Sequence, residues 1–267
     1  MAKPSLITAV NNAKTASFAY IPPAVAFNAP RIIVKPNLGY PKKPPVVISM
    51  RVLEGVLRGL RRVNPSARIL IIEGACSKVA MMDLFKRSGI DDLLDDGMQV
   101  ADAEELPLRD YPNLLPEPIK YKTMRAPAVL GDYECLISVG AFKRTTLKGE
   151  PLISASLKNL YGLFPRDFYH GRSPNARGQL HQPSVPEILK DVYFTIGHLF
   201  DGAVVDLDQK FVSPDHKPDR GEAVPVGQVV WGDDLLAVDE AACRLGGEQV
   251  ASYLTPIRDL RDTLVAN

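Results

Sequence analysis

Hydrophobic and polar positions fall into short apolar runs that alternate with segments of helical character. The apolar runs predict strands at residues 31–37, 67–74, 98–102, 133–140, 199–206 and 224–231. Helical spacing and end signals predict helices at residues 46–63, 81–88, 91–96, 154–163, 185–196, 234–245 and 255–265. This alternation favours an α/β fold, a mainly parallel sheet with helices on both faces. We expect residues 1–267 to form one domain, with an irregular, loop-rich insertion or small subdomain at about residues 141–200.

Several predicted strands end in polar side chains. In a parallel sheet, ligands bind at the carboxyl ends of the strands. We therefore expect a site made of the residues that follow or end the predicted strands, namely Asn37, Glu73, residues 140–143, Asp201 and Asp233.

The strongest indication of a functional site is a lysine and an asparagine that are surrounded in the sequence by apolar residues. Lys158 and Asn159 lie within the otherwise apolar residues 157–163, and a lysine is costly to bury unless its charge is compensated. Together with Lys143 and Arg144 upstream, they predict a cationic pocket for an anionic group, in which arginine offers a bidentate fork and lysine a point charge. A snorkelling Lys158 and a solvated loop around Lys143 are the alternatives.

Other candidate groups have equally plain alternatives. Lys35 and Asn37 flank a proline at a strand end, where they hold a carboxylate or phosphate, or form a surface lysine and an Asx turn. Glu73 ends a buried strand and is a candidate general base or cation ligand, or a cap of the next helix. His170 and His181 lie in a loop-rich segment and are candidate acid–base groups.

Two groups of carboxylates would bind a divalent cation if they met in space. They are Asp201, Asp206 and Asp208, and Asp233, Asp234 and Asp239. Asp234 is also the expected N-cap of the helix at residues 234–245. Because the histidines have no metal-ligand spacing, we assign no metal ligand.

Composition and absent motifs narrow the classes of function. The 267 residues carry a net charge of +1, which argues against a protein that coats nucleic acid. Three scattered cysteines predict reduced thiols, and no run is apolar enough for a membrane span or signal peptide, so we expect a cytoplasmic protein without membrane partners. The chain lacks GxGxxG after a strand, GxxxxGK[ST], HExxH and GxSxG, so no cofactor is indicated. With no activated nucleophile in view, covalent catalysis is not favoured.

Six motifs occur in a characteristic order. They are Val34-Lys35-Pro36-Asn37, Ile72-Glu73-Gly74, Phe142-Lys143, Leu157-Lys158-Asn159-Leu160-Tyr161-Gly162, Asp201-Gly202 and Trp231-Gly232-Asp233-Asp234-Leu235-Leu236-Ala237-Val238-Asp239. Over about residues 30–250, this set resembles the family catalogued as domain of unknown function 362. The resemblance implies the fold and the site positions, whereas the family name implies no settled reaction.

Two departures from the family pattern matter. The family usually reads Lys-Thr-His after the third strand, whereas this chain reads Lys143-Arg144-Thr145. A role for that histidine is therefore not carried over, and His170 or His181 would have to replace it. Many relatives also carry a ferredoxin-like cysteine-rich module, which this chain lacks.

These observations predict an enzyme that acts on a small anionic metabolite, a carboxylate or phosphate, by isomerisation, elimination or cyclisation. The expected catalytic residues are Glu73, Lys143, Lys158, His170, His181 and Asp201. The expected substrate-binding residues are Lys35, Asn37, Arg144, Asn159 and Asp233. The alternative is a non-catalytic ligand-binding protein or a redox partner of an iron–sulfur system. The sequence leaves the substrate, a divalent cation and homo-oligomer formation open.

Overall fold

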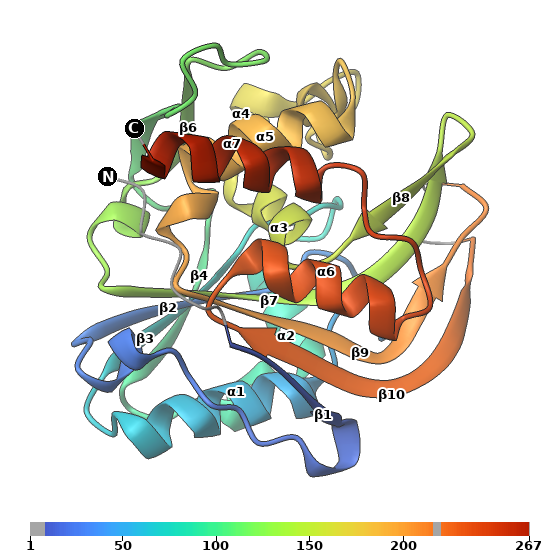
Figure 1. Cartoon of the computed structure of the whole chain (residues 1–267). Coiled ribbons are helices and arrows are strands. Elements are labelled where there is room, and N and C mark those ends of the chain that lie inside the picture. The colour runs from blue at the N-terminus through green and yellow to red at the C-terminus, as the bar shows by residue number, and fades with distance from the viewer. Residues whose placement is uncertain (1–8, 216–219, 267) are drawn as a thin grey trace.

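The computed structural model describes residues 9–215 and 220–266, and most of its strands belong to one large sheet (Figure 1). In this described part, the sheet strands are β1 Val10–Lys14, β2 Arg31–Pro36, β3 Arg68–Glu73, β4 Met98–Asp102, β7 Cys135–Leu147, β8 Glu150–Ser154, β9 Gly202–Val212 and β10 Glu222–Gly232. Their order is β1-β10-β9-β7-β2-β3-β4, and β8 pairs with β7. A separate hairpin joins β5 (Leu108–Pro112) to β6 (Thr123–Pro127).

The centre of the sheet is parallel and one side of it is antiparallel. β2 runs parallel to β3 and β7, β4 runs parallel to β3, and β9 runs parallel to β7. β10 runs antiparallel to β9, and β1 runs antiparallel to β10. The carboxyl ends of β2 and β3 therefore share one edge of the sheet, while the last residues of β10 lie at the other edge.

Helices cover both faces of the sheet (Figure 1). Their bounds are α1 Met50–Val63, α2 Met81–Ser88, α3 Ser156–Asn159, α4 Arg166–Tyr169, α5 Val185–Thr195, α6 Leu235–Leu245 and α7 Leu254–Ala266. Short 3-10 helices span Thr15–Ser17, Ala24–Phe27, Ile90–Leu93, Ala128–Gly131, Leu160–Leu163, Gly178–His181 and Gly197–Leu199. One apolar core joins α1 and α2 to the sheet, and a second joins α3, α5, α6 and α7 to its other face. The expected α/β fold, mainly parallel with helices on both faces, is confirmed.

Side-chain alternation along β2 directs a charged group into the layer of α3. Ile32 and Val34 pack in the core under α1, while Ile33 packs in the core under α3. Successive side chains of a strand point to opposite faces, so Lys35 shares the direction of Ile33. A lysine thus enters the interior near the end of a strand whose preceding residues, Ile32–Val34, are apolar.

Several element bounds differ from the sequence predictions. The predicted strand at residues 133–140 continues to Leu147, because β8 pairs with its second half. The predicted helix at residues 154–163 is divided into α3 and the 3-10 helix Leu160–Leu163. β1, β5, β6 and β8 were not predicted, since their short runs mix polar and apolar residues. The separate subdomain at residues 141–200 stays a prediction, and in the described residues no helix is long and apolar enough to span a membrane.

A buried carboxylate of α5 holds the loop between β5 and β6. Asp191 is 0% exposed. Its Oδ1 accepts hydrogen bonds from Asn113 Nδ2 (2.8 Å) and Ile119 N (2.9 Å), and its Oδ2 accepts from Lys120 N (2.8 Å) and Tyr121 N (3.0 Å). Four donors therefore compensate one buried negative charge and fix the loop to the helix layer.

We expect Asp191→Ala to lower the free energy of unfolding by on the order of 3 kcal/mol, because it leaves several part-buried donors without their acceptor. Urea unfolding followed by circular dichroism measures this loss. Asp96→Ala, at an exposed aspartate before β4, is the matched control and should change stability little. Equal effects of the two substitutions would contradict the anchoring role of Asp191.

Candidate functional site

Two buried side chains of opposite charge meet where β2 and β3 end. Lys35 is 1% exposed and Glu73 is 2% exposed, and Lys35 Nζ lies 2.6 Å from Glu73 Oε1. The carboxylate also accepts hydrogen bonds from Leu38 N (2.9 Å) and Gly74 N (2.8 Å). Both oxygens of Glu73 are thus engaged inside the protein, which favours a positioning role over the proton transfer expected from the sequence.

A glycine makes room for this ion pair. A Cβ atom at Gly162 would clash with the Glu73 carboxylate and lie 2.7 Å from Lys35 Nζ. Burial lowers the pKa of Lys35, and the adjacent Glu73 carboxylate acts in the opposite direction. The Leu-Tyr-Gly motif therefore requires glycine at this position, because its backbone lies close to a buried charge pair and leaves no room for a Cβ atom.

Asn159, at the end of α3, connects the ion pair to β7. Its Oδ1 accepts a hydrogen bond from Lys35 Nζ (2.8 Å). Its Nδ2 donates to Lys35 O (2.9 Å), Ser138 Oγ (3.0 Å) and Val139 O (3.3 Å). Because backbone carbonyls only accept hydrogen bonds, the amide has one favourable orientation, with its oxygen toward the Lys35 ammonium group.

A second amide extends the network to another lysine. Asn37 Nδ2 donates to Asn159 Oδ1 (3.2 Å), and Asn37 Oδ1 accepts from Lys143 Nζ (3.2 Å). Lys143 Nζ also donates to Val46 O (2.9 Å). The structure thus brings five of the predicted residues into one hydrogen-bonded network, namely Lys35, Asn37, Glu73, Lys143 and Asn159.

Lys143 and Lys158 are the chemically unusual groups of the site. Burial and, to a smaller extent, the positive charge of Lys158 lower the pKa of Lys143 to about 8. Burial also lowers the pKa of Lys158, whose Nζ lies 5.0 Å from the centre of the Tyr161 ring. In the described part of the chain, neither lysine has a carboxylate within ion-pair distance. The site therefore holds two lysines that no described carboxylate neutralises.

Arg177 contacts Gly162 next to the network and was missed by the sequence analysis. This buried arginine donates to Ala75 O and Gly162 O, both at 3.1 Å, and its Nη2 lies 3.1 Å from Glu104 Oε1. Its Nη1 also lies 3.1 Å from Cys76 Sγ. Nothing in the sequence separates Arg177 from the other arginines of its loop-rich segment. Cys76 lies two residues after the Glu73-Gly74 motif, and this position close to a predicted strand end could have marked it as a site residue.

α6 supports the short helix that carries Lys158 and Asn159. Asp239 is 0% exposed, and its carboxylate accepts from Ser156 N (2.8 Å), Ser156 Oγ (2.5 Å) and Leu157 N (3.0 Å). Burial raises the pKa of Asp239 to about 6, and these hydrogen bonds act against the rise. Asp239 is thus a positioning group for α3 and not part of a cation site.

Asp201 and Asp233 lie at the opposite edge of the sheet from the lysines. Asp201 N donates to Leu136 O (2.8 Å), and Asp201 Oδ2 accepts from Leu136 N (3.0 Å), at the beginning of β7. Asp233 follows β10, whose antiparallel direction brings it to this same edge. The prediction that both aspartates join the carboxyl-end site is wrong, because Asp201 precedes β9 and because β10 runs against its neighbour.

Arg144 and His170 lie outside the network. Arg144 follows Lys143 on β7 and so points to the other face of the strand, where its Nε lies 4.0 Å from Glu248 Oε2. His170 is exposed, with Nδ1 2.9 Å from Gly171 O. Arg144 and Lys143 therefore point to opposite faces of β7 and do not contact the same anion, contrary to the expectation.

His181 packs against the same aromatic ring that Lys158 contacts. Its Nδ1 lies 3.1 Å from Arg177 O, and its ring packs edge-to-face on Tyr161 with 5.7 Å between ring centres. His181 and Lys158 thus share Tyr161 as a neighbour, and the replacement of the missing histidine by His181 stays a prediction.

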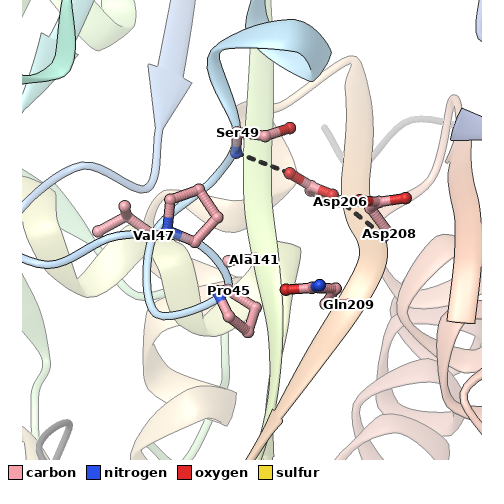
Figure 2. A pocket seen from close by; sticks show the side chains of 8 residues that line it. Pro45, Val47, Ser49, Ala141, Asp206, Asp208 and Gln209 are labelled. Carbon is pink, nitrogen blue, oxygen red and sulfur yellow. Dashed lines mark hydrogen bonds between the residues drawn. The ribbon is translucent and has the colours of Figure 1, made fainter. Parts of the chain in front are cut away.

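A small pocket lies between the segment at residues 44–49 and strands β7 and β9 (Figure 2). It is lined by Pro44, Pro45, Val47, Ser49, Ala141, Asp206, Asp208 and Gln209. Asp206 Oδ2 accepts from Ser49 N (2.7 Å) at the start of α1, and burial raises the pKa of Asp206. Its two carboxylates make this pocket unsuited to an anion. Within residues 9–215 and 220–266, no group of three His, Cys, Asp or Glu side chains is arranged to hold a metal ion.

We expect Glu73→Gln to lower the free energy of unfolding by about 3–5 kcal/mol, because it leaves the buried Lys35 ammonium unpaired. The double variant Lys35→Met/Glu73→Gln removes both charges and should recover much of this loss. Denaturant unfolding of the wild type, both single variants and the double variant gives the coupling between the two residues. Purely additive losses would show that the ion pair is not the source of the effect.

The lowered pKa of Lys143 predicts a pH-dependent reactivity. Its amine should react with acetic anhydride with a midpoint near pH 8, and Lys158→Met should raise that midpoint because it removes a neighbouring positive charge. Since the unfolded chain holds this proton up to about pH 10.5, the contribution of Lys143 to stability should increase between these two pH values. Mass spectrometry of peptides labelled at each pH measures the midpoint, and a value near 10.5 would contradict the prediction.

Comparisons with known proteins concern the fold and the family. No curated protein matches the chain significantly. The structure is similar to that of the lactate racemase apoprotein from Thermoanaerobacterium thermosaccharolyticum, with 14% sequence identity and a TM-score of 0.47. The match covers 75% of this chain and 47% of that one, so this chain spans about half the length of that protein. The profile of the family described as Domain of unknown function (DUF362) matches residues 32–244, and the chain therefore belongs to this family.

Proposed function

We propose that this protein is a cytoplasmic enzyme that binds a small carboxylate or phosphate anion and moves a proton on it. The observation that carries the proposal is the pair Lys143 and Lys158, two lysines of lowered pKa without a carboxylate partner among the described residues. Lys158 binds the anion, Lys143 takes part in the proton transfer, and the Asn37–Asn159 network holds Lys143 in place.

The charge balance of the site supports an anionic ligand. Glu73 compensates Lys35, and Glu104 is shared between Arg166 and Arg177. The two remaining lysines repel each other and are partly removed from water, and both effects disfavour their charged forms. An anion bound between them would relieve both costs, so the ligand that fits this site carries a negative charge.

The pKa of Lys143 supports proton transfer. An amine with a pKa of about 8 is neutral in roughly a tenth of the molecules at neutral pH, whereas an ordinary lysine is almost fully charged. General acid–base catalysis is most effective when the pKa of the group is close to the working pH. Isomerisation, elimination and cyclisation of a bound anion would each use such a group for proton transfer.

The test is hydrogen–deuterium exchange at carbon. The protein is incubated in D2O with small 2-hydroxy and 2-oxo carboxylates and with their phosphate esters, and NMR follows the loss of carbon-bound hydrogen. We expect exchange in at least one compound, and we expect Lys143→Met and Lys158→Met to reduce its rate by about 100-fold or more, the range typical of a lost acid–base group.

Lys148→Met, at an exposed lysine of the β7–β8 turn, is the matched control and should exchange at the wild-type rate. Thermal shift with the same anions separates binding from catalysis. Anions that stabilise the wild type without any exchange would favour a non-catalytic ligand-binding protein. If the protein neither binds any compound of the panel nor catalyses exchange in any of them, the proposal is overturned.

A further inference from the structure

We propose that Lys143 forms an imine with its substrate, so that the substrate class is a small oxo acid, a carbonyl compound that also carries a carboxylate. This inference rests on the proposed function and names its substrate class. It also replaces the expectation that covalent catalysis is disfavoured, which was drawn because the sequence shows no activated nucleophile.

The hydrogen bonds of Lys143 match a neutral amine. Its Nζ has two partners in the described structure, Asn37 Oδ1 at 3.2 Å and Val46 O at 2.9 Å, and both are acceptors. A neutral amine has two N–H donors and one lone pair, whereas an ammonium group has three donors and no lone pair. The two acceptors satisfy the neutral form and leave its lone pair free to attack.

The orientation of this arrangement is fixed from the far end of the network. Asn159 Nδ2 faces the carbonyls of Lys35 and Val139, so its oxygen faces Asn37. Asn37 must then present its nitrogen to Asn159 and its oxygen to Lys143. A flipped Asn37 amide would place an N–H against Lys143 and an oxygen against Asn159 Oδ1. The network therefore presents an acceptor to Lys143, never a donor that would occupy its lone pair.

Lys158 supplies the two further features that an imine-forming lysine needs. Its positive charge disfavours the protonated form of Lys143, as a second cation does for nucleophilic lysines in general. The same charge is available to the carboxylate of the substrate, because Lys158 has no carboxylate partner among the described residues. An oxo acid presents both groups that the two lysines would receive.

The reaction step balances without a further reactant. Lys143 Nζ adds to the carbonyl carbon, and one amine proton moves to the carbonyl oxygen, which gives a carbinolamine. That hydroxyl group takes a proton from solvent and leaves as water, while the nitrogen lone pair forms the C=N bond of the iminium ion. A proton then leaves the neighbouring carbon to water, and the C–H electron pair moves toward the iminium nitrogen. This is the proton movement that the proposed function requires.

Reductive trapping tests the imine. The full chain is incubated with pyruvate and sodium cyanoborohydride, which adds hydride to the iminium carbon and fixes the adduct as a secondary amine. Peptide mapping by mass spectrometry should find the adduct on Lys143. Lys143→Arg keeps a positive charge but forms no imine, and it should show no adduct while its circular dichroism spectrum stays that of the wild type. Lys148→Met should be labelled at Lys143 as the wild type is.

Matched small molecules test the role of Lys158. Acetone has the carbonyl without the anion, and it should label Lys143 about tenfold more slowly than pyruvate, a difference of about 1.4 kcal/mol. Lactate has the anion without the carbonyl and should slow labelling by pyruvate. In Lys158→Met, the preference for pyruvate over acetone should be lost.

The outcomes separate this inference from the proposed function. An adduct on other lysines, or none on Lys143, overturns the imine whatever the exchange experiment shows. Carbon-bound exchange without a trapped adduct leaves the proposed function in place, with Lys143 as a direct proton acceptor. An adduct on Lys143 without any exchange supports the imine and removes the proton-transfer function.

Discussion

The site depends on one buried ion pair. Lys35 enters the interior at the end of an apolar strand, and its charge must be compensated there. Glu73 supplies the negative charge from the adjacent strand at 2.6 Å, and Gly162 permits the approach because it has no Cβ atom. Three segments far apart in the sequence therefore have to converge at one point, and a change in any of them would leave a buried charge without its partner.

The ion pair also fixes the orientation of the side-chain amides of Asn159 and Asn37. Asn159 is oriented by backbone carbonyls and by the Lys35 ammonium group. Asn37 therefore directs its nitrogen toward Asn159 and its oxygen toward Lys143. A network in which every member is satisfied is rigid. The ion pair thus determines which group faces Lys143, although it does not contact that lysine. The contacts between them allow only one arrangement of donors and acceptors.

The sequence predicted the parallel part of the site and failed at its antiparallel side. Lys35, Asn37 and Glu73 were found because apolar runs ending in polar residues mark the carboxyl ends of parallel strands. Asp201 was misplaced because it precedes β9 and does not end it. Asp233 was misplaced because an apolar run contains no information on strand direction, and β10 runs antiparallel to β9. The lowered pKa of Lys143 could not be predicted from the sequence either, because it arises from burial and from a neighbouring charge that only the fold brings close.

The remaining cost of the site has a functional meaning. A protein built for stability alone would pair Lys143 and Lys158 with carboxylates or replace them by apolar residues, because partly buried like charges destabilise the folded state. Lys35 has its own carboxylate and Arg177 shares Glu104 with Arg166, whereas Lys143 and Lys158 have no carboxylate partner among the described residues. Local violations of this kind are expected where function opposes stability. A bound anion would bring the missing negative charge to Lys158, while the amide network presents only an acceptor to Lys143.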